Sequence, residues 1–349
     1  MSNMFQLLEI IGNNAGASNK ARADVNIIAE RLGFETVRVY SPKTGGSSVS
    51  KVIGKMAFEH NLMRSLKSVD DGGLLLVQLP LLNLANRTHK NILDYCSKHD
   101  IKVISFIHDV NELRGTNASN NQPFYNLLVY SSAVISHNSE MTKHLVSKGV
   151  GSEKIINLDI FDYLLDKEKN VGCFKKQIVI GGNLDVEKVK YLKDLDKIKG
   201  CRIVLYGPNY TTSGNSENIE YKGVVDASEL PYLLNEGFGL VWDGESIETC
   251  TGWFGNYLKF NNPHKLSMYI ASGLPVIIWD QAAEANFVKE NALGITVGSL
   301  LELESLFNSL EECRYSEYTA NVKKIQNRIR TGYYAEKAIE KALNQCGSK

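Results

Sequence analysis

The chain has 349 residues, more than one hydrophobic core usually organises, so two domains are predicted. Its 39 Lys and Arg balance its 39 Asp and Glu, which excludes a global field that would draw the protein to nucleic acid or to an acidic membrane. A local basic patch would have to be sought in a structure. The six cysteines are scattered without a CxxC pair, so we expect reduced thiols rather than zinc ligands.

The beginning of the chain, residues 1–11, lacks the basic region and the long apolar stretch of a signal peptide. No later stretch approaches the ~18–20 apolar residues that a membrane span needs. We therefore expect a cytoplasmic protein with no transmembrane segment, and we interpret residues 5–11 as a buried first strand.

Short aliphatic runs alternate with amphipathic stretches through the first half of the chain, a pattern typical of βαβ units. Strands are predicted at residues 5–11, 36–40, 74–78, 102–107 and 133–136. Helices are predicted at residues 20–32, 49–66, 89–99 and 139–148. In an open parallel sheet, ligands bind beyond the carboxyl ends of the strands, so the loops there are the first candidates for chemistry.

The first such loop is glycine-rich and covers residues 12–18, between the first strand and the first helix. Glycine lets the backbone approach a ligand closely, and the helix that follows offers free N–H groups. The loop is either a tight turn or a cleft-facing loop near a phosphate or an acceptor substrate. In the second case, Gly16 and Ser18 are the candidate contacts. It does not have the GxGxxG spacing of a dinucleotide site.

The second candidate is the pair His108 and Asp109, which follows the buried run 103–107. A hydroxyl that acts as a nucleophile must lose its proton, and an imidazole or a carboxylate can accept it. The other interpretation is a loop pair in which one side chain caps a turn. We favour a catalytic role and prefer Asp109 to His108 slightly.

A second α/β series follows the charged residues 166–170, so the linker is placed near residue 168. Strands are predicted at residues 177–181, 202–206, 239–242, 275–279 and 294–297. Helices are predicted at residues 186–195, 227–235, 264–272, 282–290 and 300–313. A long helical pattern from 316 to about 345 is broken near residue 332. Its apolar positions suit an oligomer interface as well as a core, so a homo-oligomer stays open.

Residues 261–265, Asn-Asn-Pro-His-Lys, read as a helix start. Asn262 suits the N-cap, Pro263 suits the first helical position, and Gly273 ends the helix. His264 and Lys265 then occupy the first turn, where the helix dipole disfavours cations. A bound anion such as a diphosphate would offset that cost and use the free N–H groups, whereas the alternative is an exposed lysine without a partner.

Three further loops follow strands in this half. Gly182 and Asn183 come after the strand at 177–181, and Tyr206 ends the next strand. Glu284 and Asn286 open a helix after the strand at 275–279. The carboxylate of Glu284 either binds ribose hydroxyls or complements the dipole of its helix.

The order of these segments resembles the donor domain of GT-B glycosyltransferases. The resemblance rests on Gly-Asn at 182–183, on the aromatic loop 250–260, on Asn-Asn-Pro-His-Lys at 261–265 and on Ala-Ser-Gly-Leu-Pro-Val-Ile at 271–277. More narrowly, the chain is similar to bacterial β-1,6-galactofuranosyltransferases and to the third glucosyltransferase of serine-rich-repeat adhesin glycosylation. Residues 106–110 and 237–242 also match, so the similarity spans nearly the whole chain.

The resemblance implies two Rossmann-like domains facing across a cleft: an acceptor domain at 1–168, a nucleotide-sugar domain at 169–315, and helices at 316–349 that cross back to the first domain. It also implies inverting transfer of galactofuranose or glucose from a UDP-sugar to a glycan or glycoprotein acceptor, in polysaccharide assembly or adhesin glycosylation. The residues expected around the nucleotide-sugar are Gly182, Asn183, Tyr206, Asn262, His264, Lys265, Glu284 and Asn286. Lys265 would contact the diphosphate.

Asp194 and Asp196 have the Asp-x-Asp spelling of a metal-binding pair, but they lie in a charged helical stretch rather than at a strand end. We therefore expect no metal and no other cofactor, with Lys265 and helix dipoles neutralising the leaving group. Two alternatives stay open: a catalytically inactive sugar-nucleotide-binding subunit, and a scaffold of a glycosylation complex.

Overall fold

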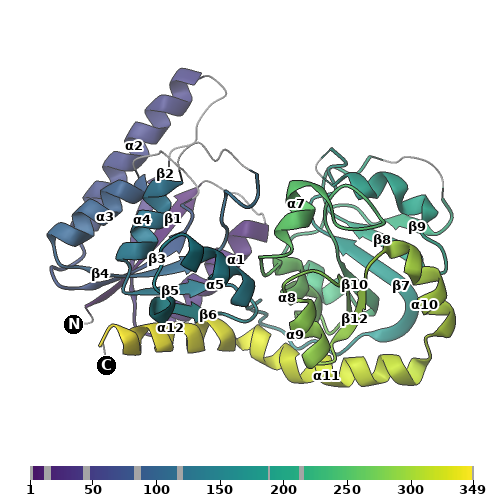
Figure 1. The fold of residues 1–349 in the computed structure, drawn as a ribbon. Helices are drawn as coiled ribbons and strands as arrows, with labels where there is room; N and C mark the ends of the chain where they lie inside the picture. The colour runs from purple at the N-terminus through teal and green to yellow at the C-terminus, as the bar shows by residue number, and fades with distance from the viewer. Residues whose placement is uncertain are drawn as a thin grey trace. The chain divides into compact units, whose positions relative to one another are not determined.

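A computed structural model describes residues 3–11, 17–41, 48–81, 88–115, 121–187, 189–211 and 216–347. The chain forms two compact units (Figure 1). The first unit extends to Leu158 and includes the chain again from Ala335, and the second unit runs from Asp159 to Tyr334. The boundary between the units lies at Leu158, before the linker expected near residue 168. The segment after Leu158 bonds within the second unit, since the Tyr163 N–H donates to the carbonyl of Ile329.

The first unit is built on a parallel six-stranded sheet with the order β2-β1-β3-β4-β5-β6. Every residue of β3 is buried, as expected for a parallel strand that is covered on both faces. Its strands are β1 (Met4–Ile11), β2 (Glu35–Ser41), β3 (Leu74–Leu79), β4 (Lys102–Ile107), β5 (Ala133–Ser136) and β6 (Ile155–Asn157).

Helices connect successive strands of this sheet (Figure 1). The start of α5 shows how a neighbouring residue fixes a helix end: the side chain of Asn138 accepts hydrogen bonds from the N–H groups of Glu140 and Met141. The helices are α1 (Ala17–Arg31), α2 (Ser48–Leu66), α3 (Thr88–Lys98), α4 (Gln122–Tyr130), α5 (Ser139–Ser147) and, from the end of the chain, α12 (Tyr333–Gln345), with a 3₁₀ turn η1 (Ser152–Lys154).

The second unit has a parallel sheet with the order β12-β11-β10-β7-β8-β9. Its strands are β7 (Cys173–Gly181), β8 (Arg202–Tyr206), β9 (Ile219–Tyr221), β10 (Glu236–Val241), β11 (Val276–Trp279) and β12 (Gly294–Val297). Its helices are α6 (Leu230–Leu233), α7 (Gly252–Tyr257), α8 (His264–Ala271), α9 (Ala285–Glu290), α10 (Leu303–Ser309) and α11 (Glu312–Thr331), with 3₁₀ helices η2 (Lys190–Lys197) and η3 (Leu300–Glu302).

A tyrosine fixes α8 on this sheet. The ring of Tyr269 packs directly on Gly239 of β10, where an added Cβ would lie 2.0 Å from the ring. The Tyr269 hydroxyl also accepts a hydrogen bond from the Gly181 N–H at the end of β7, at 2.8 Å. This contact places the first turn of α8 at the carboxyl edge of the sheet.

The predicted strands are present, and the sequence analysis missed the short edge strands β6 and β9 and the helices α4 and α7. Several predicted helices of the second unit differ from those observed. The helix predicted at 282–290 begins at Ala285, and the helix predicted at 300–313 is divided among η3, α10 and the start of α11. α6 begins at Leu230, because Pro231 lacks the N–H that a helix starting at residue 227 would need at that position. In place of the α-helix predicted at 186–195, residues Lys190–Lys197 form the 3₁₀ helix η2, where Leu192 and Leu195 align on one buried side. The predicted break near residue 332 is confirmed, since Gly332 has φ 98°.

Candidate functional site

The start of α8 lies at the carboxyl edge of the second sheet, as the sequence predicted. Lys265 Nζ is 2.9 Å from a carboxylate oxygen of Asp243 and donates to the carbonyl of Trp242 at 3.1 Å. Asp243 lies two residues after the end of β10, so a carboxylate and a lysine meet at this edge. The lysine without a partner, which was the alternative interpretation, is therefore wrong.

The predicted cap of α8 is also wrong. The helix begins at His264 after Pro263, and no side chain caps it. The Asn262 amide instead donates to the carbonyl of Asp159 at 3.1 Å. Asn262 therefore joins two segments of the second unit through its amide NH₂ group.

His264 is held by aromatic rings from the same entering segment. Its ring stacks on Tyr163 with centroids 4.8 Å apart, and the edge of Phe161 approaches at 6.0 Å. These contacts orient the imidazole at the first turn of α8.

Gly182, Asn183 and Tyr206 lie together at the ends of β7 and β8. The Gly182 N–H donates to the Tyr206 carbonyl at 3.0 Å, and Gly182 has φ 130°, which favours glycine. The Asn183 side chain accepts from the Asn209 amide at 2.9 Å. Burial raises the pKa of Tyr206, which keeps its hydroxyl protonated and able to donate. The structure brings these three predicted residues to one place.

Glu284 and Asn286 differ in exposure. Glu284 is buried at the start of α9, and its side chain does not cap the helix. Asn286 is exposed in the first turn. Of these two predicted residues, Asn286 is therefore the one whose side chain is open to solvent.

In the first unit, His108 and Asp109 follow β4, at the carboxyl edge of the sheet. Asp109 forms an ion pair with Arg114 at 2.8 Å, and this guanidinium stabilises the charged carboxylate. His108 is buried, and its Nε2 lies 2.6 Å from Oε1 of Gln78 on the neighbouring strand β3.

Gln78 determines which nitrogen of His108 carries the proton. The Gln78 amide nitrogen donates to Asn26 Oδ1 at 2.7 Å and to the backbone carbonyl of Arg22 at 3.3 Å. A backbone carbonyl can only accept, so the amide NH₂ faces it and the Gln78 oxygen faces His108. This oxygen has no hydrogen, so His108 Nε2 is the donor, and in the neutral ring Nδ1 carries the lone pair.

Arg22 reinforces this arrangement. Its guanidinium donates to the carbonyls of Gln78 and Pro80, at 3.2 and 2.5 Å. Burial lowers the pKa of Arg22, and the charges of Glu9 and Asp109 oppose that effect. Asp109 is therefore influenced by a second guanidinium besides Arg114, which further favours its charged form.

Sequence reasoning missed Asp243, Gln78 and Arg22. Asp243 had a usable signal, because it lies two residues after a buried strand. Gln78 had a weaker one, as a polar residue within the apolar run 74–79. Gly16 lies outside the described residues, and of Ser18 the structure describes only its backbone within α1.

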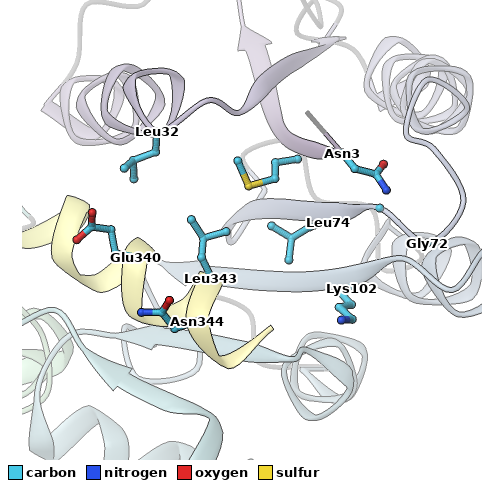
Figure 2. A pocket seen from close by; sticks show the side chains of 10 residues that line it. Asn3, Leu32, Gly72, Leu74, Lys102, Glu340, Leu343 and Asn344 are labelled. Carbon is cyan, nitrogen blue, oxygen red and sulfur yellow. The ribbon is translucent and has the colours of Figure 1, made fainter. Parts of the chain in front are cut away.

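A cavity of the first unit lies away from these residues. It measures about 690 Å³ and opens at the amino ends of β1, β3 and β4 (Figure 2). Leu343 and Asn344 of α12 face Leu74 and Lys102 across it. It lies at the opposite end of the strands from His108.

Over the described ranges, no cluster of three or more His, Cys, Asp or Glu side chains could hold a metal ion. Asp194, of the Asp-x-Asp spelling, lies in η2 and pairs with Lys197 at 2.6 Å. Among the helices that the structure describes, none has the length and apolar character to cross a membrane.

Comparison with known proteins identifies the family. Residues 6–160 match the glucosyltransferase 3-like N-terminal domain, and residues 178–342 match the corresponding C-terminal domain. The chain is 33% identical to the β-1,6-galactofuranosyltransferase WbbI of Escherichia coli K12 over 98% of both chains. It is 26% identical to glucosyltransferase 3 of Streptococcus gordonii over 93% of both chains.

A solved structure shares the fold. Anabaena HepE, in complex with UDP-glucose, superposes with a TM-score of 0.62 at 12% identity, over 99% of this chain and 100% of that one. The fold is GT-B, with two Rossmann-like units. The chain belongs to the glucosyltransferase 3-like family and is a glycosyltransferase, as the resemblance predicted.

Proposed function

We propose that the chain transfers galactofuranose or glucose from a UDP-sugar to a glycan or glycoprotein acceptor, with inversion and without a metal. The observation that carries the proposal is Lys265 in the first turn of α8, a helix start that no side chain caps, at the edge where Gly182 and Tyr206 also lie. A helix N-terminus with a lysine suits a diphosphate. The activities for which the relatives are named supply the two candidate sugars.

The second unit would hold the donor. Lys265 would leave or share its contact with Asp243 when the diphosphate arrives, because a doubly charged ligand outcompetes one partly exposed carboxylate. Asp243 keeps the ammonium at the edge meanwhile. As the bond between the anomeric carbon and the diphosphate breaks, Lys265 and the α8 N–H groups would stabilise the charge of the departing UDP.

The first unit would supply the base. Inverting transfer is a single displacement: the acceptor oxygen attacks the anomeric carbon, and its proton passes to a base. We assign this role to His108, which reverses the slight sequence-based preference for Asp109, because the guanidinium groups near Asp109 oppose the transfer of a proton to its carboxylate. Gln78 holds the His108 proton on Nε2, so Nδ1 would accept the acceptor's proton.

A panel of UDP-sugars tests this function. Purified protein is incubated with UDP-galactofuranose, UDP-glucose and UDP-galactose, with and without EDTA, and released UDP is measured. We expect one of the first two to be used and EDTA to have no effect. Binding of UDP in calorimetry without turnover of any sugar would favour the inactive subunit, and no binding would favour the scaffold.

A further inference from the structure

The amino-terminal half of α2 exposes a cluster of apolar side chains. Val52, Ile53 and Met56 are 57%, 60% and 67% exposed. Later in the same helix, Phe58 and Leu62 are fully buried against the unit. The second half of α2 is therefore packed, while the first half presents apolar side chains to solvent.

The cluster projects beyond the sheet. The Asn61 side chain donates to the Tyr40 carbonyl, and Ser65 Oγ donates to the Arg38 carbonyl, so α2 runs antiparallel to the edge strand β2. β2 ends at Ser41. At 1.5 Å per residue, Val52 lies about 13 Å along the helix from Asn61, past the end of the strand. Figure 1 shows this end of α2 extending away from the rest of the unit.

Basic side chains flank the cluster. His60 and Arg64 follow Met56 at helical spacing and are exposed, as is Lys67 just after the helix. Glu59 is the acidic residue of α2, and it is half-buried. The chain as a whole has no net charge, so the positive potential at this helix is local.

From this combination we propose that α2 docks the protein on an anionic lipid bilayer. Val52, Ile53 and Met56 would enter the boundary between headgroups and acyl chains, while Arg64 and Lys67 would contact anionic headgroups. A protein partner fits these observations less well than a bilayer does. Three partly exposed side chains supply far less than the roughly 800 Å² per partner that a stable interface buries.

This docking goes beyond the transfer reaction and has a consequence for it. β2 and β4 are parallel strands of one sheet, so the projecting end of α2 and His108 lie at the same edge. Docking through α2 would bring this edge towards the bilayer, within reach of an acceptor that is anchored in the membrane.

Vesicle flotation of the full chain tests the proposal. Vesicles of phosphatidylcholine with about one third phosphatidylglycerol are compared with vesicles of phosphatidylcholine alone, at low salt and in 0.5 M NaCl. We expect binding to the anionic vesicles that weakens at high salt, because exposed charges are screened. The double variant Ile53→Asp and Met56→Asp should bind at least about tenfold more weakly, since both side chains would have to carry charge into the boundary.

The matched control is the double variant Val224→Asp and Leu233→Asp, which places the same two charges at side chains that are 67% and 50% exposed in the second unit. It should bind vesicles like the unaltered protein. Circular dichroism and UDP-release assays on all variants confirm that they fold. Equal binding by the α2 double variant and the control, or no preference for anionic vesicles, would overturn the proposal. So would a dimer in light scattering that the α2 double variant dissociates, because α2 would then be a protein interface.

Discussion

Replacing Gln78 by Met tests whether the buried amide controls His108. The substitution removes the acceptor of the His108 N–H and the donor to Asn26 Oδ1 while nearly keeping the side-chain volume. Each buried group left without a partner costs about 1–3 kcal/mol, so the free energy of unfolding should fall by about 2–6 kcal/mol. Loss of ring orientation should also lower kcat/KM for transfer at least about tenfold, because a positioned base contributes about 10²–10⁴ to rate.

Gln6→Met is the matched control. Gln6 is buried on the neighbouring strand β1 and donates to the Asn26 carbonyl and to Thr36 Oγ1, but it does not touch His108. It should lose comparable stability in urea unfolding and keep kcat/KM close to that of the unaltered enzyme. A structural role of Gln78 alone would make the two variants equal in both measurements.

The direct assay is ¹⁵N NMR of the histidine ring in the unaltered protein, which distinguishes the two neutral tautomers. We expect the proton of His108 on Nε2. A proton on Nδ1 would refute the hydrogen-bond argument, even if Gln78→Met proved too unstable to study. Gln78→Glu gives a second readout: the carboxylate should favour the charged imidazole and move the acid limb of the pH–rate profile upwards by about 1–3 pH units.

The remaining predictions concern the donor site, the metal and pH. Lys265→Ala should weaken UDP binding in calorimetry by roughly tenfold to a hundredfold, since hydrogen bonds to charged groups contribute about 1.5–3 kcal/mol; Lys190→Ala, which breaks the exposed pair with Glu245, should not. Extensive chelation followed by assay should leave transfer unchanged, and a loss that Mn²⁺ or Mg²⁺ restores would contradict the metal-free assignment. Burial lowers the pKa of His89 to about 4 from an ordinary 6.5, so the unfolded chain binds the extra proton first. Stability should therefore fall as pH drops below 6.5, by about 2 kcal/mol at pH 5 from this residue. In urea unfolding at pH 7.5 and 5, His89→Phe should show less of this loss; an identical pH dependence would contradict the assignment.

Local pattern was enough to predict much of this protein. The apolar runs of β3 and β4 and the alternation with helices predicted parallel sheets, because burial on both faces demands continuous apolar strands. The proline and glycine that bracket residues 264–272 predicted α8, because helix ends are encoded by neighbouring residues. These features depend on residues close together in the chain.

Hydrogen-bond partners were decided by the tertiary structure. His108 contacts Gln78, 30 positions earlier in the chain, because β3 and β4 are adjacent in the sheet. The residues of neither strand specify that order. Asn262 has the chemistry of a cap, yet its amide bonds Asp159, 103 positions away. The partner of a polar side chain therefore depends on which distant segments folding brings within reach. The sequence alone could therefore predict a helix start that faces an anion, and only the fold showed that Asp243 already lies beside Lys265.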